Sequence, residues 1–140
     1  MTDAMILLVA WDGSAPADRG FEYALELARL RRLSLRVMCV IELPEVYGGM
    51  GTGEVDAAEL AGQRVRVDAL CARARRAGVE CRGEVRVGAA ADQILAALRE
   101  PGTAGLVMGR SDKGVLMRWL VGSVSRGVIA QAPVPVTLVP

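Results

Sequence analysis

The sequence has 140 residues, of which 52% are hydrophobic, 24% charged and 4% aromatic, and its formal net charge is +1. This balance fits one folded domain over residues 1–140 and excludes the polar, highly charged composition of disordered chains. Histidine is absent, which excludes Ser-His-Asp and Cys-His nucleophile systems and every metal site that needs imidazole. We expect a cytoplasmic protein, because no apolar run reaches the roughly 18 to 20 residues that span a membrane and no basic segment precedes the first apolar stretch.

Acidic and basic residues are unevenly divided along the chain. Residues 1–70 hold 11 acidic and 7 basic side chains, a balance of −4, whereas residues 71–140 hold 5 and 10, a balance of +5. The second half is therefore the better location for an anionic ligand, while the scattered charges and scarce aromatics argue against nucleic acid as a partner. The cysteines Cys39, Cys71 and Cys81 lack C-x-x-C spacing, which favours buried reduced thiols over a disulfide framework or a zinc site.

The first predicted elements form a strand-helix-strand unit. Residues 5–10 are a continuous apolar run, typical of a strand that is covered on both faces of a parallel sheet. Apolar residues then recur at helical spacing over about 15–32, with Ser14 as the N-cap and Pro16 in the first turn. Residues 34–41 supply the second apolar strand.

A glycine-rich segment separates this unit from the next helix. Residues 44–53 hold four glycines in no regular pattern, which predicts a mobile loop and does not satisfy the G-x-G-x-x-G phosphate fingerprint. A long helix is expected over 54–77, ended by Gly78. Residues 79–87 alternate apolar and charged side chains, which indicates a half-exposed edge strand.

The last part of the chain continues the alternation of helices and strands. We expect a helix over 88–99, a strand at 106–108, a helix that runs to about Gln131, and a fifth strand over 134–139. Five strands alternating with four main helices predict an open, doubly wound, Rossmann-like α/β sheet of five parallel strands in a single domain.

The fold class predicts where a ligand would bind. Open α/β sheets collect ligands at the carboxyl ends of their strands, beside the point where the strand order reverses. The segments to consider are therefore residues 10–14, after the first strand, and residues 109–125, after the fourth. Gly109 would let a phosphate or a ribose approach the backbone where a Cβ would intrude.

The start of the last helix is the candidate anion site. Gly122 and Ser123 open a helix whose first N–H groups, Val124 among them, have no partner within the helix. Such a helix start binds anions, and Arg110 lies nearby in sequence and would strengthen the positive field. The residues leave open the alternative that Ser123 only caps the helix and that the glycines only make turns.

Several segments together resemble the universal stress protein family. Its C-terminal signature is similar to the run VMGRSD at 107–112, followed after nine residues by GSV at 122–124 and by PVPV at 133–136. In the nucleotide-binding branch of the family the pattern is G-x2-G-x9-G-[S/T]. The family's first strand and Asp-Gly-Ser turn resemble LVAWDGS at 8–14, and the start of its third helix resembles residues 87–94. The resemblance covers almost the whole chain.

The resemblance implies a site for an adenine nucleotide, with ATP, and possible magnesium, as the expected cofactors. By position, Asp12 corresponds to the acidic residue near the adenine and the ribose, and Val40 to the second-strand residue whose backbone faces the adenine. The remaining positions correspond to the ribose and phosphate region. The candidate nucleotide-binding residues are Asp12, Val40, Gly109, Arg110, Asp112, Gly122, Ser123 and Val124.

One position departs from the family pattern. The second glycine of the motif is replaced by Asp112, whose carboxylate would meet the phosphate region and whose Cβ would crowd the backbone. Gly114 would compensate by reshaping the loop, or a bound magnesium ion would offset the charge. The other explanation is that this member of the family has lost nucleotide binding.

We therefore expect a cytoplasmic stress-response protein that binds ATP as a sensor or signalling module and forms a homodimer through its C-terminal strand. Slow hydrolysis is left open, since phosphoryl transfer needs little beyond positioning and electrostatics. The alternative is a nucleotide-free dimeric interaction module of the same fold. A flavodoxin-like ligand carrier ranks last, because residues 12–16 make a poor phosphate loop. Trp11 is expected to pack in the core, with stacking on an adenine as the other option.

Overall fold

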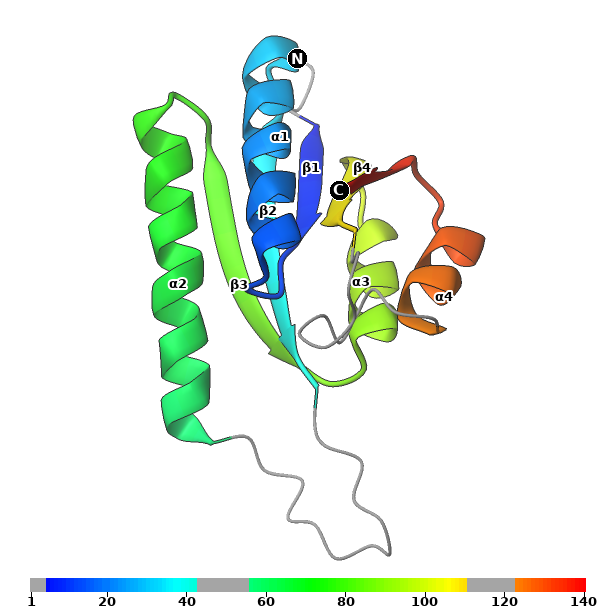
Figure 1. The fold of residues 1–140 in the computed structure, drawn as a ribbon. Helices are drawn as coiled ribbons and strands as arrows, with labels where there is room; N and C mark the ends of the chain where they lie inside the picture. The colour runs from blue at the N-terminus through cyan, green and yellow to red at the C-terminus, as the bar shows by residue number, and fades with distance from the viewer. Residues whose placement is uncertain (1–4, 43–55, 111–122) are drawn as a thin grey trace, which may run out of the picture.

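The computed structural model describes residues 5–42, 56–110 and 123–140, and within these ranges five parallel strands form one sheet in the order β3-β2-β1-β4-β5 (Figure 1). The order reverses between β1 and β4, which follow each other in the sheet but not in the chain. The predicted doubly wound parallel sheet with four helices is confirmed. The elements are β1 (Ile6–Ala10), α1 (Ala15–Arg31), β2 (Ser34–Ile41), α2 (Ala57–Arg76), β3 (Cys81–Val87), α3 (Ala90–Leu98), β4 (Thr103–Gly109), α4 (Ser123–Gln131) and β5 (Val136–Val139).

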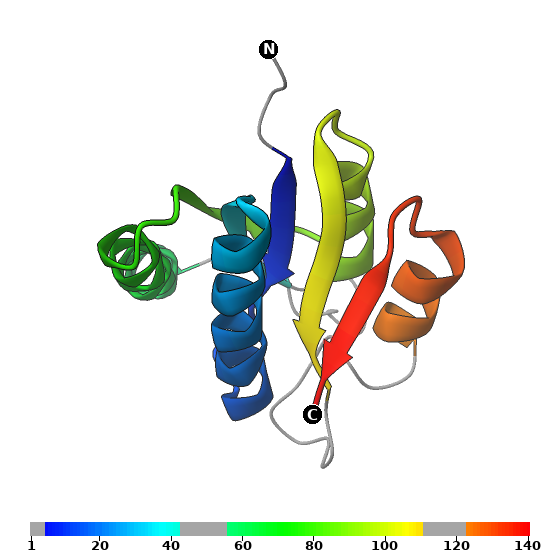
Figure 2. The same ribbon diagram turned by 90° about the horizontal axis from the view of Figure 1, so that it is seen from above.

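Helices cover the sheet on both faces. Helices α1 and α2 lie on one face, where α1 packs on β1 and β4 and α2 on β2 and β3 (Figures 1 and 2). Helices α3 and α4 pack against each other on the opposite face. The central strands β1 and β2 are buried almost throughout, which explains their unbroken apolar sequences. No helix of the described residues is both long and apolar enough to cross a membrane.

The helix ends follow the capping signals of the sequence. The Ser14 hydroxyl accepts a hydrogen bond of 3.2 Å from the N–H of Ala17, and Pro16 occupies the first turn of α1, as predicted. Helix α2 begins later than predicted because the carboxylate of Asp56 caps it. Gly78 adopts a φ of +84° just beyond its end, a conformation that favours glycine at this position.

Two strand boundaries differ from those that the sequence indicated. Strand β4 begins at Thr103, earlier than predicted, because this weakly apolar start pairs with Ile6 of β1. Strand β5 begins only at Val136, since Pro133 and Pro135 have no N–H to donate to a ladder. Pro135 still joins the sheet as an acceptor, through a 2.9 Å hydrogen bond from the N–H of a β4 residue.

Two glycines let α1 approach β4 closely. A Cβ on Gly109 would lie 2.5 Å from the backbone nitrogen of Ala17 and closer still to the carbonyl group of Pro16. From the other side, a Cβ on Gly20 would lie 3.3 Å from the backbone nitrogen of Gly109. Helix α1 therefore rests on the backbone of β4 with no side chain between them, at the carboxyl end of that strand.

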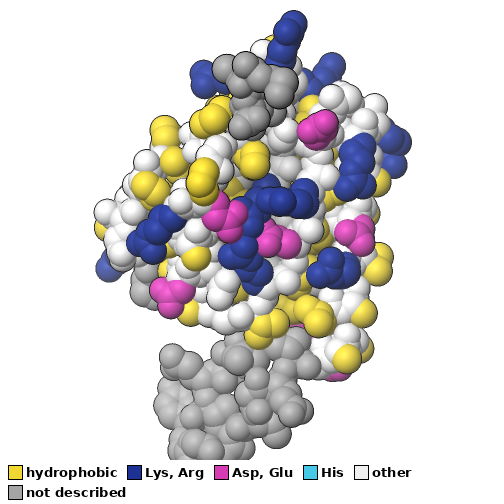
Figure 3. Space-filling model, turned by 180° about the vertical axis from the view of Figure 1, so that it is seen from behind, with side chains coloured by type: hydrophobic (Ala, Val, Ile, Leu, Met, Phe, Trp, Pro, Cys, Tyr) yellow, Lys and Arg dark blue, Asp and Glu magenta, His cyan; other side chains and the backbone are white. Residues whose placement is uncertain are grey.

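The opposite face of β2 and β3 carries a cluster of paired charges. Arg36 of β2, which is 5% exposed, forms ion pairs with Glu84 of β3 and with Glu100 beyond α3. Arg86 pairs with Glu84 at 3.0 Å and with Glu100 at 3.6 Å, so the four side chains make one network. In Figure 3, which shows the molecule from behind, acidic and basic side chains adjoin near the middle of the face. The buried arginine is acceptable there because both of its partners are carboxylates.

Removing Arg36 is expected to destabilise the fold. Arg36→Ala leaves Glu84 without its closest cation in a partly buried position, and we expect the free energy of unfolding to fall by about 2 kcal/mol. Arg73→Ala is the matched control, because the ion pair between Arg73 and Glu22 is half exposed and surface pairs contribute little. Urea unfolding of both variants checks this, and equal losses in the two would contradict it.

The same network gives a pH dependence with a defined sign. The hydrogen bond from Arg36 lowers the pKa of the Glu100 carboxyl below its usual value, and the charges of Arg36 and Arg86 act in the same direction. A carboxyl whose pKa is lower in the folded state stabilises the fold above its unfolded pKa and loses that contribution as the pH falls through the folded value. The difference in unfolding free energy between the unmodified chain and Arg36→Ala should therefore be full at neutral pH and shrink in acid.

Candidate functional site

The ends of β1, β2 and β4 bring four of the predicted site residues to one place. Ala10 of β1 pairs with Met38 of β2 on one side and with Met108 of β4 on the other. Two residues further along each strand lie Asp12, Val40 and Arg110, and Gly109 directly precedes Arg110. These residues therefore share the carboxyl edge of the sheet at the reversal of strand order, where open α/β sheets bind ligands. Asp12, Gly109 and Arg110 thus lie at the edge to which the topology argument pointed, and ligand binding there stays a prediction.

The carboxylate of Asp12 is only half satisfied. Its Oδ1 accepts a hydrogen bond of 3.0 Å from the N–H of Ser14, which holds the turn between β1 and α1. Its Oδ2 is buried and has no hydrogen-bond partner among the described residues. Buried carboxylate oxygens without a donor are uncommon and costly, because the group loses its hydration and gains nothing in return. Asp12 is thus an acceptor at the switch point that is available to a ligand with an N–H or O–H group.

The backbone of Val40 points toward the same place. The carbonyl of Met38 accepts a 2.9 Å hydrogen bond from the N–H of Trp11, so the backbone groups of Met38 face β1. Alternate residues of a strand direct their backbone groups to the same neighbour, and Val40 therefore faces the same side. The pairing of β1 with β2 ends at Ala10 and Met38. The side chain of Val40 is buried, so its backbone is the part that a ligand would meet.

The other predicted residues lie around the end of β4 and the start of α4. The N–H of Arg110 donates to the carbonyl of Val139 in β5 over 2.5 Å, and its side chain is exposed. Ser123 and Val124 are the first two residues of α4, which starts at the carboxyl edge of the sheet because it connects β4 to the parallel strand β5. The structure describes the helical backbone there, while Asp112 and Gly122 lie outside the described residues, as does the predicted loop over 44–53.

Gly109 has a reason in packing that the sequence did not reveal. The space that its Cβ would occupy is filled by the backbone of Pro16 and Ala17. Glycine is therefore required at this position by the close approach of α1, whether or not a ligand also touches the backbone. The same contact places the first turn of α1 beside the end of β4.

Arg66 is a residue of this region that sequence reasoning missed. It projects from α2 to the turn after β1, where its guanidinium donates to the carbonyl of Gly13 over 3.3 Å. The guanidinium carbon also lies 4.7 Å from the centre of the Trp11 ring, within the range of a cation–π contact. The Trp11 side chain is 2% exposed and its Nε1 donates to Asp18, so it packs in the core as expected and is not available to stack on a base. No spacing in the sequence links residues so far apart.

Glu42 is a second residue that the sequence did not single out. It follows the last residue of β2, and its carboxylate accepts a 3.1 Å hydrogen bond from the N–H of Ala90. Helix α3 has no capping side chain of its own, so Glu42 supplies both the acceptor and the negative charge that a helix start favours. Glu42, a carboxylate beside the expected adenine-binding region, thus has a structural role as the cap of α3.

Cys39 lies close to Asp12, and its thiol is unreactive at neutral pH. It is 3% exposed, and burial, together with the negative charge of Asp12, raises the pKa of its thiol to about 11. The thiol is therefore protonated at neutral pH, and only thiolates are effective nucleophiles or metal ligands. Across the described ranges, no three side chains of the metal-binding types come together.

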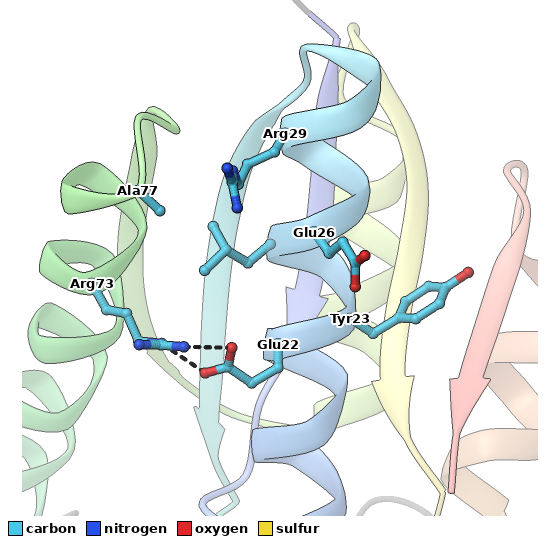
Figure 4. Close-up of a pocket in the computed structure, with 7 residues that line it drawn as sticks. Glu22, Tyr23, Glu26, Arg29, Arg73 and Ala77 are labelled. Carbon is cyan, nitrogen blue, oxygen red and sulfur yellow. Dashed lines mark hydrogen bonds and ion pairs between the residues drawn. The ribbon is translucent and has the colours of Figure 1, made fainter.

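A cavity of about 540 Å³ lies elsewhere, between α1 and α2 (Figure 4). Arg73 of α2 reaches across it to form two hydrogen bonds of 2.7 Å with the carboxylate of Glu22. Two of the charges that face this cavity, those of Glu22 and Arg73, are therefore paired with each other. The ion pair between Glu22 and Arg73 is half exposed to solvent. The cavity is lined by Glu22, Tyr23, Leu25, Glu26, Arg29, Arg73 and Ala77, none of them a predicted site residue.

Comparisons with known proteins place this chain and its fold in a family. A comparison with curated protein sequences gives no match. Among solved structures, a universal stress protein of Archaeoglobus fulgidus in complex with dAMP is 26% identical, aligned over 100% of both chains with a TM-score of 0.72. A protein of the universal stress protein family from Burkholderia pseudomallei is 26% identical over 97% of this chain and 96% of the other, with a TM-score of 0.70.

A third structure agrees in fold alone. The universal stress protein family protein of Arabidopsis thaliana, with AMP bound, is 16% identical over 96% of this chain and 90% of the other, with a TM-score of 0.60. The sequence model of the universal stress protein family itself matches residues 5–140, almost the entire chain. The sheet order agrees with this match. Because the family model covers almost the entire chain, the chain belongs to the universal stress protein family.

Proposed function

We propose that this protein binds an adenine nucleotide, ATP, at the carboxyl edge of β1, β2 and β4, and acts as a stress-response sensor rather than as a fast enzyme. The observation that carries the proposal is the buried Oδ2 of Asp12, an acceptor without a donor at the switch point. Adenine offers an exocyclic amino group and ribose offers hydroxyl groups, and both are donors that a carboxylate accepts. The cytoplasmic location expected from the sequence stays a prediction.

Two further observations support an adenine nucleotide over other ligands with donors. The backbone of Val40 faces the same edge beyond the end of its pairing with β1, which suits the donor and acceptor atoms on the edge of a base. A family member that is 26% identical over its whole length was solved in complex with dAMP. These observations support a base and a sugar at this edge, which is the common part of AMP, dAMP and ATP.

The phosphate chain is assigned to the start of α4. The first N–H groups of a helix have no partners within it and carry partial positive charge, which favours phosphate oxygens. Ser123 and Val124 contribute these groups, and the exposed Arg110 belongs to the same end of the sheet. Asp112 would hold a bound magnesium ion, because a carboxylate is the kind of ligand that this ion prefers, and the ion would offset the negative charge.

A second candidate function is a nucleotide-free dimeric module of the same fold. It is favoured by one feature, the aspartate at position 112 in place of the second glycine of the nucleotide-binding motif. An uncompensated carboxylate beside phosphates would repel them. The two functions differ in whether the purified protein retains or takes up a nucleotide, and mass spectrometry of the extracted ligand distinguishes them directly.

Asp12 gives the sharpest test of the binding site. Asp12→Asn replaces one acceptor by a donor that faces the donor of the ligand, and we expect the affinity for ATP to fall by about tenfold or more. Asp68→Asn, which removes an exposed carboxylate from α2, is the matched control and should bind like the unmodified chain. Titration calorimetry with ATP and AMP measures both, and equal affinity in the two variants would remove Asp12 from the site.

Gly122 and Asp112 test the phosphate region. Gly122→Val would place a branched side chain against the phosphates and is expected to abolish ATP binding. Asp112→Gly restores the family motif and should bind ATP as tightly as the unmodified chain or more tightly, with less need for magnesium. Calorimetry with magnesium and with a chelator separates these effects. Unchanged affinity in Gly122→Val would mean that the phosphates lie elsewhere.

We also propose a homodimer formed through β5. In the described part of the sheet, β5 lies at the edge, with β4 as its neighbour on one side. Unpaired strand edges associate readily, and two-fold contacts are the commonest way in which they close. Leu138 is 38% exposed and presents apolar surface on this strand.

The dimer is tested by adding charge to the edge strand. Leu138→Lys should convert the dimer to a monomer, because two like charges would approach each other across the two-fold axis. Leu30→Lys is the control, since Leu30 is 76% exposed at the far end of α1. Sedimentation velocity at micromolar concentration reports the mass. A monomer for the unmodified chain would contradict the proposal.

A further inference from the structure

Two buried cysteines lie side by side between α2 and β3. The Sγ atoms of Cys71 and Cys81 are 3.0 Å apart, with the thiol of Cys81 donating to Cys71. Their exposed fractions are 1% and 7%, and both are free thiols. The sequence predicts three buried reduced thiols, because neither the odd number of cysteines nor their spacing indicates a pair. The packing of α2 on β3 creates the pair.

Gly83 allows the two sulfur atoms to meet. It lies two residues after Cys81 in β3, on the face that α2 covers, and α2 runs beside β3 in Figure 1. A Cβ at Gly83 would lie 3.0 Å from the Sγ of Cys71 and closer still to a methyl group of Val67. The missing side chain therefore leaves the space in which α2 approaches the strand. A 2.8 Å hydrogen bond from Arg75 to the carbonyl of Cys81 joins the same two elements.

The environment of the pair favours a thiolate on Cys71. The hydrogen bond from Cys81 lowers the pKa of the Cys71 thiol, and the positive charge of Arg75 adds to this effect. The same hydrogen bond raises the pKa of Cys81, as does its burial. Cys71 is therefore the nucleophile of the pair and Cys81 the thiol that supplies the second sulfur. Cys39, whose pKa is about 11, has no such partner within the described residues and stays protonated.

A small oxidant has a route to the pair. Cys81 lines a cavity of about 390 Å³ at the amino ends of the strands, whose wall also includes Ser34 and Glu80. This cavity lies at the opposite end of the sheet from the candidate nucleotide site, because all five strands are parallel. A molecule of the size of hydrogen peroxide that enters this cavity therefore meets Cys81, the more exposed member of the pair, without passing the nucleotide site.

We propose that Cys71 and Cys81 are a redox modification site, which forms an intramolecular disulfide when the protein meets hydrogen peroxide. The Cys71 thiol gives its proton to solvent, and the thiolate attacks one peroxide oxygen. The O–O bond breaks, leaving a sulfenic acid on Cys71 and a hydroxide ion that takes up a proton from solvent. The sulfur of Cys81 then attacks the sulfur of Cys71, the S–O bond breaks, and the hydroxyl group leaves as water with the proton of the Cys81 thiol.

Atoms and electrons balance in this reaction, and the disulfide that it forms can be reduced again. Two thiols and one peroxide give one disulfide and two waters, so the sulfurs lose two electrons that the peroxide gains. The sulfurs must approach by about 1 Å to reach the usual S–S bond length. A thiol reductant returns the disulfide to two thiols by thiol–disulfide exchange. The bond would tie α2, which carries Arg66, to the edge strand β3.

Thiol counting on the full chain tests the proposal. The reduced protein is exposed to hydrogen peroxide, denatured in N-ethylmaleimide and analysed by mass spectrometry. We expect modification of Cys39 alone, a peptide that joins Cys71 to Cys81 under non-reducing conditions, and three modified cysteines after dithiothreitol treatment. Cys39→Ser should form the same disulfide. Cys81→Ser should leave a sulfenic acid on Cys71 that dimedone traps.

A comparison of folded and unfolded protein shows whether proximity is the cause. The Cys71–Cys81 disulfide should form at least tenfold faster in the native protein than in the same chain unfolded in urea, because the fold holds the two sulfurs together. Equal rates, a disulfide that involves Cys39, or two free thiols at positions 71 and 81 after peroxide would each overturn the proposal. The comparison uses the unmodified chain, so it stands even where a cysteine variant fails to fold.

Discussion

The close approach of α1 to the carboxyl end of β4 is the contact on which the rest of the structure depends. Gly20 and Gly109 leave only backbone between the two elements, so the helix is held at a short, fixed distance from the sheet. Interiors are packed too tightly to absorb an added side chain there without moving the helix. The first turn of α1 is thereby anchored, and with it the turn that carries Asp12. Gly109, which the sequence resemblance assigns to ligand contact, is thus a packing residue.

Helix α2 completes the arrangement from the side of β3. Its Arg66 covers the turn after β1 through Gly13 and the Trp11 ring, and its Cys71 packs into the space that Gly83 leaves. On the opposite face of β2 and β3, the charges of Arg36, Glu84 and Arg86 are joined in one ion-pair network. The edge strand β3 therefore has an apolar face toward α2 and a charged face toward solvent, as its alternating sequence requires.

The carboxylates of Asp12 and Glu42, at the same edge of the sheet, differ in their hydrogen-bond partners. An acceptor such as the Oδ2 of Asp12 that is buried without a donor costs roughly 1–3 kcal/mol, because its hydration is lost. Proteins retain such groups where a ligand supplies the missing donor. Glu42, a neighbouring carboxylate at the end of β2, by contrast accepts a hydrogen bond from the start of α3 and caps that helix. The two acidic residues at this edge thus differ in their hydrogen bonds, and the proposed ligand site is at Asp12.

The sequence by itself determined the order and type of every element, because apolar runs, helical spacing and caps such as Ser14 are local signals. It also placed Asp12, Gly109 and Arg110 at one edge, since parallel strands all end on the same side. Only the tertiary structure decided that β4 begins at Thr103, that Gly109 faces the backbone of α1, and that Arg66 reaches Trp11. It alone brought Cys71 to Cys81. These contacts join elements far apart in the chain, or depend on the absence of a side chain at one glycine, and no local pattern encodes either.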